Sequence, residues 1–202
     1  MSAAVSAQQV KELRERTGAG MMECKQALSE TKGNLDEAVD VLRKKGIAKA
    51  AKKSGRETSE GAVGSYVHMG GKIAVLVEVN CETDFVAKTD EFQAFVRDLA
   101  MHIAGANPVP RYVTRDQVPP EDIEHEKEII AAQPDMAGKP EAVRGKIIEG
   151  RISKFLGEIS LMDQAFVKDP DHTVAEVLHR QIAKLGENIS IRRFVRFQLG
   201  GD

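Results

Sequence analysis

Residues 73–79, Ile-Ala-Val-Leu-Val-Glu-Val, form an almost unbroken apolar run rich in β-branched side chains. Such a run predicts a β-strand that is buried on both faces. Two glycines, Gly70 and Gly71, separate it from a second extended stretch at residues 65–69. The sequence therefore predicts a β-hairpin with a tight turn, which needs helices or further strands to cover it.

A polar turn at residues 80–86 follows this strand and leads into a helical pattern. Thr89 is a suitable N-cap for that helix, which begins with two acidic residues. Its apolar residues fall on one stripe: Phe92, Phe95, Val96, Leu99 and Ile103. Phe85 and Asp84 lie in the connection, and such loops usually lie on the surface. Two interpretations are open: Phe85 inserts into a partner beside Asp84, or Phe85 folds back into the helix core while Asp84 caps a turn.

Three helical patterns occupy the first 45 residues or so and predict a compact helical bundle. Gly18 and Gly33 supply stops, and Asn34 with Glu37 matches a capping box at the start of the third helix. Such small bundles bury little surface, so their functions are nearly always binding. Two consecutive methionines, Met21 and Met22, lie between the first helices, and we expect one to be buried and the other to be offered to a partner.

Charge is distributed unevenly along the chain. Residues 1–56 contain 12 basic and 7 acidic residues, whereas the remaining residues contain 17 basic and 24 acidic ones. Seven of the basic residues fall in one stretch without acidic residues: Arg43, Lys44, Lys45, Lys49, Lys52, Lys53 and Arg56. Alanines within it favour a helical linker. One interpretation of this linker is a segment that binds nucleic acid. Because it lacks interleaved aromatic residues, a solvated helix face or a contact with an acidic protein partner fits the pattern equally well.

Helices and one strand are predicted for the rest of the chain. One helix is expected at residues 121–132 and a second from Pro140 through Glu158. The second carries an apolar stripe that can pack on the sheet: Val143, Ile147, Ile148, Ile152, Phe155 and Leu156. Residues 161–167 predict a short extended segment. Asp171 or Thr173 can cap a last helix, which is expected to end at Gly186. Residues 189–199 predict a strand whose arginines (Arg192, Arg193, Arg196) either meet phosphate or form an open charged face.

The expected fold class is α+β. An N-terminal three-helix bundle with its basic linker takes residues 1–55, and residues 56–202 form a small antiparallel sheet covered by helices. A sheet of about three strands is small and leaves a face or an edge to cover. Dimerisation through the sheet would cover it.

Several classes of function are disfavoured. The chain has 42% hydrophobic and 30% charged residues, ordinary for a soluble protein, with no bilayer-length apolar stretch and no signal pattern at its start. We therefore expect a cytoplasmic protein with reduced thiols at Cys24 and Cys81 and no membrane contact. Phosphate loops, zinc spacings and nucleophile elbows are missing. The best enzymatic alternative is a Cys81 nucleophile with His68 as its base, but no nearby positive charge would lower the thiol pKa. We predict neither catalysis nor a cofactor or metal.

Four stretches together resemble one family, the bacterial translation elongation factor Ts. They are spread from end to end, and the first and third are long enough to be specific: Leu13 to Lys25 (LRERTGAGMMECK), Lys49 to Lys53 (KAAKK), Val79 to Lys88 (VNCETDFVAK) and Gly186 to Ile189 (GENI). The resemblance implies a guanine nucleotide exchange factor for the GTPase elongation factor Tu in its GDP-bound form, without direct nucleic-acid binding.

The resemblance also implies roles for particular residues. The N-terminal bundle would be a ubiquitin-associated-like domain that grips the GTPase, and its contact positions match Val10, Lys11, Arg14, Met21 and Met22. The signature Thr83-Asp84-Phe85-Val86 would wedge between helices near the bound magnesium and phosphates. Leu185 matches an apolar position that supports the wedge, and His68 matches a hairpin-tip residue that touches a distant domain of the partner.

Longer family members have two similar core halves and an inserted coiled coil, whereas this chain has one hairpin leading into the signature and returns once. It is similar to the short form, which implies a homodimer and a two-to-two complex with the GTPase. Some short members carry a cysteine in the final strand where this chain has Val195. A covalent link at that position is therefore excluded, and the dimer would rest on packing.

Two rivals remain at this point. An RNA-binding or ribosome-binding module would use residues 44–56 and 192–196 and would show steep salt dependence. The acidic balance of residues 57–202 argues against it. A ubiquitin-type adaptor would use the bundle alone and would survive deletion of everything after residue 60.

Overall fold

The computed structural model describes residues 5–201 and shows an α+β chain with eight α-helices and five strands in that range. Residues 1–4 and 202, which are the ends of the two predicted domains, lie outside the described part. Contacts group the chain into two compact units. One contains Met1–Val63, Glu78–Val96 and Ala175–Ile191, and the other contains Gly64–Val77, Arg97–Val174 and Arg192–Asp202. The domain boundary after residue 55 stays a prediction.

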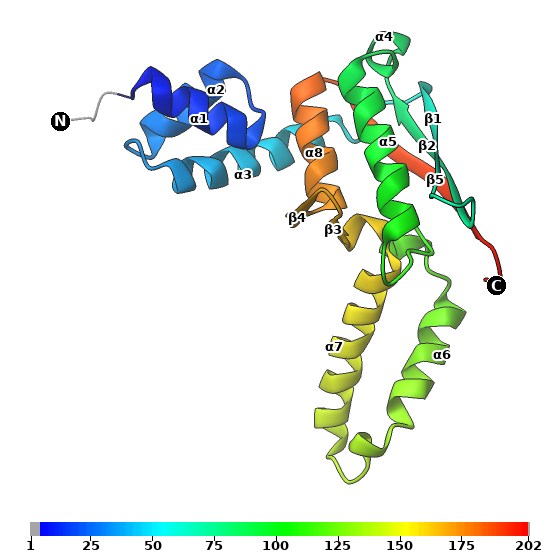
Figure 1. Cartoon of the computed structure of the whole chain (residues 1–202). Helices are drawn as coiled ribbons and strands as arrows, with labels where there is room; N and C mark the ends of the chain where they lie inside the picture. Colours follow the sequence, from blue (N-terminus) through cyan, green and yellow to red (C-terminus); the bar gives the residue numbers. More distant parts are fainter. Residues whose placement is uncertain (1–4, 202) are drawn as a thin grey trace. The chain divides into compact units, whose positions relative to one another are not determined.

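The N-terminal bundle forms as the apolar spacing predicts. Its helices are α1 (Ala7–Thr17), α2 (Met21–Glu30) and α3 (Leu35–Lys53), which pack against one another (Figure 1). They bury a small apolar core between them: Leu13, Cys24, Ala27, Leu28, Ala38 and Leu42. Three helices that share so few large side chains have little core volume, which fits a module built to bind.

Local capping chemistry ends and starts these helices. Gly18 adopts a left-handed conformation with φ 68° and donates to the Arg14 carbonyl, as predicted for a helix stop. The Asn34 side chain accepts from the backbone N–H groups of Asp36 and Glu37. The predicted capping box is only half formed, because the Glu37 carboxylate accepts from the Asn34 side-chain amide at 2.8 Å.

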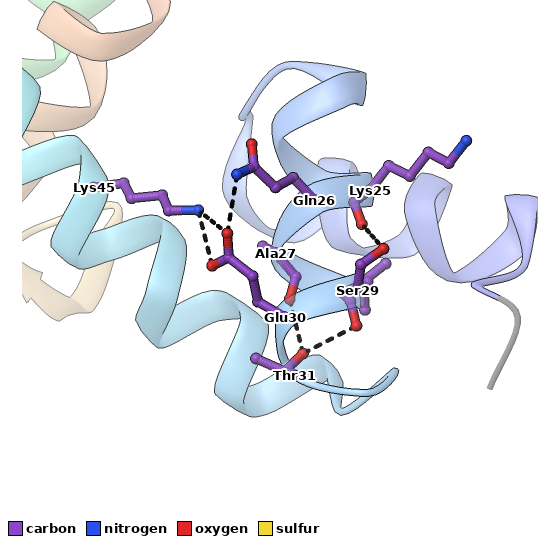
Figure 2. Close-up of polar contacts among 8 residues, drawn as sticks. Lys25, Gln26, Ala27, Ser29, Glu30, Thr31 and Lys45 are labelled. Atoms are coloured by element: carbon purple, nitrogen blue, oxygen red, sulfur yellow. Dashed lines mark hydrogen bonds and ion pairs between the residues drawn. The ribbon is translucent and has the colours of Figure 1, made fainter. Parts of the chain in front are cut away.

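Helix α3 is longer than predicted, because it absorbs most of the basic stretch. It runs for 19 residues to Lys53, so the predicted linker is its C-terminal half. Figure 2 shows Lys45 of this half reaching both carboxylate oxygens of Glu30 on α2, at 2.8 and 2.9 Å. The Gln26 side-chain amide donates to the same carboxylate at 3.0 Å. The hydrogen bond from Lys45 holds the pKa of Glu30 below its usual value.

The hairpin consists of β1 (Glu60–Val67) and β2 (Ile73–Cys81), and it turns at Gly70 and Gly71, which have φ values of 86° and 69°. Strand β5 (Ile189–Gln198) completes a three-stranded sheet in the order β1-β2-β5. Strand β1 starts at Glu60, before the extended stretch predicted at residues 65–69.

The prediction that the central strand is buried on both faces is wrong. Its alternate residues Val75, Val77, Val79 and Cys81 are buried, whereas Leu76 is 47% exposed. The described chain therefore covers one face of β2 and covers the other only in part. A β-strand points successive side chains to opposite faces, and an apolar run alone does not reveal whether both faces find a cover.

The segment after β2 contains a one-turn helix, α4 (Asp84–Ala87), and then α5 (Asp90–Gly105). Thr89 caps α5 as predicted, because its hydroxyl oxygen accepts from the Phe92 N–H at 3.2 Å. The predicted stripe is confirmed, since all its members are buried: Phe92, Phe95, Val96, Leu99 and Ile103.

A helical hairpin follows α5 and the short turn η1 (Arg115–Gln117). It consists of α6 (Pro120–Ala131) and α7 (Glu141–Ile159), joined through η2 (Pro134–Met136), and the two helices lie side by side in Figure 1. The expectation that α7 lays its stripe on the sheet is wrong: α7 packs along α6, and Val143 remains 45% exposed. The two helices were predicted at residues 121–132 and 140–158, but their packing against each other was not.

The chain returns through short elements. The expected extended piece at residues 161–167 begins instead with the turn η3 (Leu161–Asp163), and only Ala165–Phe166 form a strand, β3, antiparallel to β4 (Asp169–Thr173). Helix α8 (Val174–Leu185) starts directly after β4 and ends at Gly186, whose φ of 81° confirms the predicted cap. Within residues 5–201, none of the helices combines the length and apolar character needed to cross a membrane.

Candidate partner-binding site

The one-turn helix α4 presents Phe85 to solvent. Thr83 precedes it in extended conformation, and its hydroxyl oxygen accepts from the Val86 N–H at 3.5 Å, so Thr83 is the N-cap. Ala87 is buried, and a residue two positions away on a helix points about 200° around the axis from it. Phe85 is accordingly 82% exposed. The alternative in which Phe85 folds back into the helix core is therefore wrong.

Asp84 lies beside Phe85 and is paired within the turn. Its carboxylate accepts from the Lys88 ammonium at 2.6 Å, and the two side chains stay 46% and 76% exposed. The hydrogen bond from Lys88 lowers the pKa of Asp84. Asp84 is thus ionised at neutral pH, and it offers a negative charge next to an exposed aromatic ring.

The turn is fastened at its C-terminal end and at its N-terminal end. Gln93 on α5 donates its side-chain amide to the Ala87 carbonyl at 2.7 Å. At the other end, the Glu187 carboxylate accepts from both the backbone N–H of Thr83, at 3.0 Å, and its hydroxyl, at 2.7 Å. The structure therefore joins the signature Thr83–Val86 to the segment that follows Leu185, although they are far apart in the sequence.

Glu82 and Glu187 are two further residues of the site, and neither was predicted from the sequence. Glu82 accepts from the Asn188 N–H at 2.6 Å, and this bond lowers the pKa of Glu82, with the charge of Arg56 adding to it. Both glutamates fall within the stretches that resemble the family. No local sequence pattern indicates that each glutamate binds the residue after the other. The sequence separation is 104 residues between Thr83 and Glu187 and 106 residues between Glu82 and Asn188.

Cys81 lies just before the turn and is fully buried. Burial, with a further contribution from the negative charge of Glu187, raises the pKa of the Cys81 thiol to about 11. Its S–H donates to the Thr83 carbonyl at 3.1 Å. The thiol is therefore protonated at neutral pH and supports the turn, which removes the thiolate that the nucleophile alternative needs.

The bundle carries the other predicted contact residues, on α1 and at the start of α2. Lys11 and Arg14 are exposed, and Val10 is half-buried against the bundle core. Met21 and Met22 are 61% and 74% exposed, so the expectation that one of them is buried is wrong. Both flexible side chains are therefore available at the surface.

His68 lies at the end of the hairpin and is exposed. Its Nδ1 atom is 3.2 Å from the Tyr66 hydroxyl, and the two rings are 6.1 Å apart between centroids. Its backbone N–H donates to the Ile73 carbonyl and its carbonyl accepts from Gly71, so the turn holds the residue in place. Leu185, at the end of α8, is half-buried.

Most of the basic stretch is engaged within the chain. Five of its seven cationic residues have partners: Lys45 with Glu30, Lys49 with Glu23, Arg43 with Glu176, Lys53 with the Gly186 carbonyl and Arg56 with Glu82. Cations that already bind carboxylates have less to gain from phosphate, so this pattern argues against the RNA-binding alternative. Among the described residues, no cluster of His, Cys, Asp and Glu side chains could hold a metal ion.

Comparison with known proteins agrees with the motif resemblance. The family model described as elongation factor TS matches residues 1–201. Elongation factor Ts of Geobacter sulfurreducens is 62% identical over 196 residues, which cover 97% of this chain and 90% of that protein. Elongation factor Ts of Carboxydothermus hydrogenoformans is 59% identical over 97% of this chain and 89% of its own length. The chain therefore belongs to the elongation factor Ts family of translation elongation factors.

Proposed function

We propose that this protein is the guanine nucleotide exchange factor of elongation factor Tu and that Asp84 and Phe85 act as the wedge that promotes GDP release. The observation that carries the proposal is the 82% exposure of Phe85 on a turn that is fastened to the chain at both ends. An exposed aromatic residue on a fixed support is well suited to insertion into a pocket of a partner.

The wedge works by coupling two binding equilibria. A factor that binds the displaced geometry of the nucleotide loops better than the closed geometry weakens nucleotide binding by the same free energy. Burial of Phe85 supplies roughly 1.5 to 3 kcal/mol. The ionised Asp84 carboxylate supplies direction and hydrogen bonding near the magnesium and the phosphates. No covalent bond forms or breaks, so no catalytic base is required.

Other predicted contacts supply affinity. The exposed Met21 and Met22 provide an adaptable apolar surface, and the exposed cations Lys11 and Arg14 on α1 add positive charge. Val10 supports this surface, His68 reaches a distant domain of the GTPase, and Leu185 backs the wedge. A role beside a translation GTPase would place the protein in the cytoplasm.

The proposal includes a homodimer that forms a two-to-two complex with the GTPase. Its support is a set of exposed apolar side chains on the hairpin, on β5 and just after β5: Val67, Met69, Leu76, Val195, Phe197 and Leu199. Several exposed apolar residues on the strands of one sheet favour burial against a second copy.

Release of fluorescent GDP from elongation factor Tu tests the exchange function. We expect the wild-type protein to accelerate release strongly, and we expect Phe85→Ala to reduce that acceleration by roughly 10-fold to 100-fold, in proportion to the lost burial. Asp84→Ala should also reduce it. Circular dichroism should show that both variants remain folded, because neither side chain is in a core.

Val143→Ala is the matched control, since Val143 is another exposed apolar residue, 45% exposed on α7 and far from the signature in sequence. This variant should accelerate GDP release from elongation factor Tu as strongly as the wild-type protein does. If the wild-type protein has no effect on GDP release, the exchange function is wrong, and the salt dependence of RNA binding becomes the next measurement.

A further inference from the structure

Glu82 and Glu187 make a reciprocal pair of contacts between two distant segments. Glu187 accepts from the N–H of Thr83, the residue after Glu82, and Glu82 accepts from the N–H of Asn188, the residue after Glu187. Each carboxylate therefore holds the backbone next to the other carboxylate. We call these two glutamates with Thr83 and Asn188 the glutamate clamp.

The clamp acts on the residue that decides the direction of α4. Thr83 is the N-cap, and its hydroxyl donates to Glu187 at 2.7 Å while its oxygen accepts from Val86. A single carboxylate thus fixes both the backbone and the side chain of this residue with charge-assisted bonds, which are stronger than neutral ones. Helix α4 has four residues, too few to persist in water without outside support.

The clamp is also tied to the C-terminal end of α3 and to Arg56 just after it. The Asn188 side-chain amide donates to the Arg56 carbonyl at 2.8 Å, and Lys53 donates to the carbonyl of Gly186. Arg56 in turn binds the Glu82 carboxylate at 3.3 Å. These bonds fix the Gly186–Asn188 segment to residues 53–56. The segment that binds Thr83 is therefore itself held in place.

We propose that Glu187 is a positioning residue for nucleotide exchange: by holding Thr83, it sets the direction in which Phe85 and Asp84 enter the partner. The inference rests on the proposed exchange function. Glu187 does not itself touch the nucleotide site. Its loss lets α4 fray, so that Phe85 remains exposed but samples many directions, and the wedge is inserted correctly only part of the time.

The experiment measures the maximal rate of GDP release and the half-saturating concentration separately for Glu187→Ala. We expect the maximal rate to fall by on the order of 10-fold to 100-fold, the size of effect that misplacement of a working group produces. The half-saturating concentration should change less, since the methionine surface of the bundle is untouched. Glu187→Gln, which keeps an acceptor oxygen for the Thr83 N–H, should be intermediate.

A double-mutant cycle separates positioning from a general structural role. In a Thr83→Val background the hydroxyl contact is already lost and only the backbone N–H contact remains, so Glu187→Ala should have a smaller further effect there. Thr83→Ser retains both donors and should keep most of the activity. Glu91→Ala is the control, because it removes a carboxylate paired to Lys184 at 2.6 Å without touching Thr83, and it should be active.

The outcomes distinguish the two proposals. If the wild-type protein does not accelerate GDP release from elongation factor Tu, the proposed exchange function is wrong. If the wild type is active and Phe85→Ala is impaired, but Glu187→Ala keeps the full maximal rate, the positioning role is wrong. Equal effects of Glu187→Ala in the wild-type and Thr83→Val backgrounds would also overturn it. Should Glu187→Ala fail to fold, Glu187→Gln against Thr83→Ser and Thr83→Val makes the same comparison.

Discussion

Single residues in this protein are set by what their polar atoms can reach. His102 on α5 is 3% exposed, its Nδ1 accepts from the Val167 N–H at 3.2 Å and its Nε2 is 3.1 Å from the Gln164 side-chain oxygen. Nδ1 therefore carries no proton, and Nε2 donates. Burial lowers the pKa of His102 from 6.5 despite the opposing hydrogen bond with Gln164.

This lowered pKa predicts acid sensitivity. Below about pH 6.5 the unfolded chain binds a proton at His102 that the folded chain does not yet accept, so the free energy of unfolding falls as pH decreases. The loss continues until pH reaches the folded pKa. His102→Gln, which can keep both hydrogen bonds, should make the fall between pH 7 and pH 5 shallower in urea titrations.

His179 is the other histidine with a pKa lowered by burial, so part of the pH dependence should survive in His102→Gln. An unaltered slope in His102→Gln would mean that His102 does not titrate differently on folding.

At the scale of elements, the start of β1 lies so close to the backbone of β2 that position 61 requires a glycine. Gly61 has φ 148°, a conformation that side chains rarely adopt, and a Cβ atom there would lie 2.7 Å from Asn80 Cα and closer still to the Val79 carbonyl oxygen. Both neighbours are backbone atoms of β2 and cannot rotate away. The two strands approach closely at this point because residue 61 has no side chain.

Gly61→Ala should therefore destabilise the protein by about 2 to 3 kcal/mol, the upper range for overpacking.

Gly46→Ala should change the free energy of unfolding in the opposite direction. Gly46 lies inside α3 with open space around it, so alanine should raise the free energy of unfolding by up to about 1 kcal/mol through helix propensity. Urea unfolding of the two variants checks the pair, and a neutral Gly61→Ala would show that the strands can separate there at little cost.

At the scale of the whole molecule, the proposed homodimer makes a prediction about mass. One chain has a mass of 22.1 kDa, so sedimentation equilibrium should give about twice that value. Phe197 on β5 is 64% exposed, and Phe197→Glu should shift the protein to the mass of one chain, because a buried unpaired charge is costly at an apolar interface.

Val143→Glu on α7 places the same charge on the exposed part of the helical hairpin and should leave the dimer intact. A shift with Val143→Glu but not with Phe197→Glu would move the interface to the hairpin of α6 and α7. A single-chain mass for the wild type would mean that the partly covered sheet face does not pair copies of this chain.

The sequence by itself determined the elements whose signals are local. The bundle helices with their glycine stops, the Gly70-Gly71 hairpin, the Thr89 cap and the buried stripe of α5 were all predicted, because caps, turns and periodicity depend on residues a few positions apart. Only the tertiary structure decided that Phe85 points to solvent, that Leu76 is exposed, that α7 pairs with α6, and that Glu187 holds Thr83. Each of these depends on which segments pack together in three dimensions, and no local pattern specifies which partner a side chain will meet.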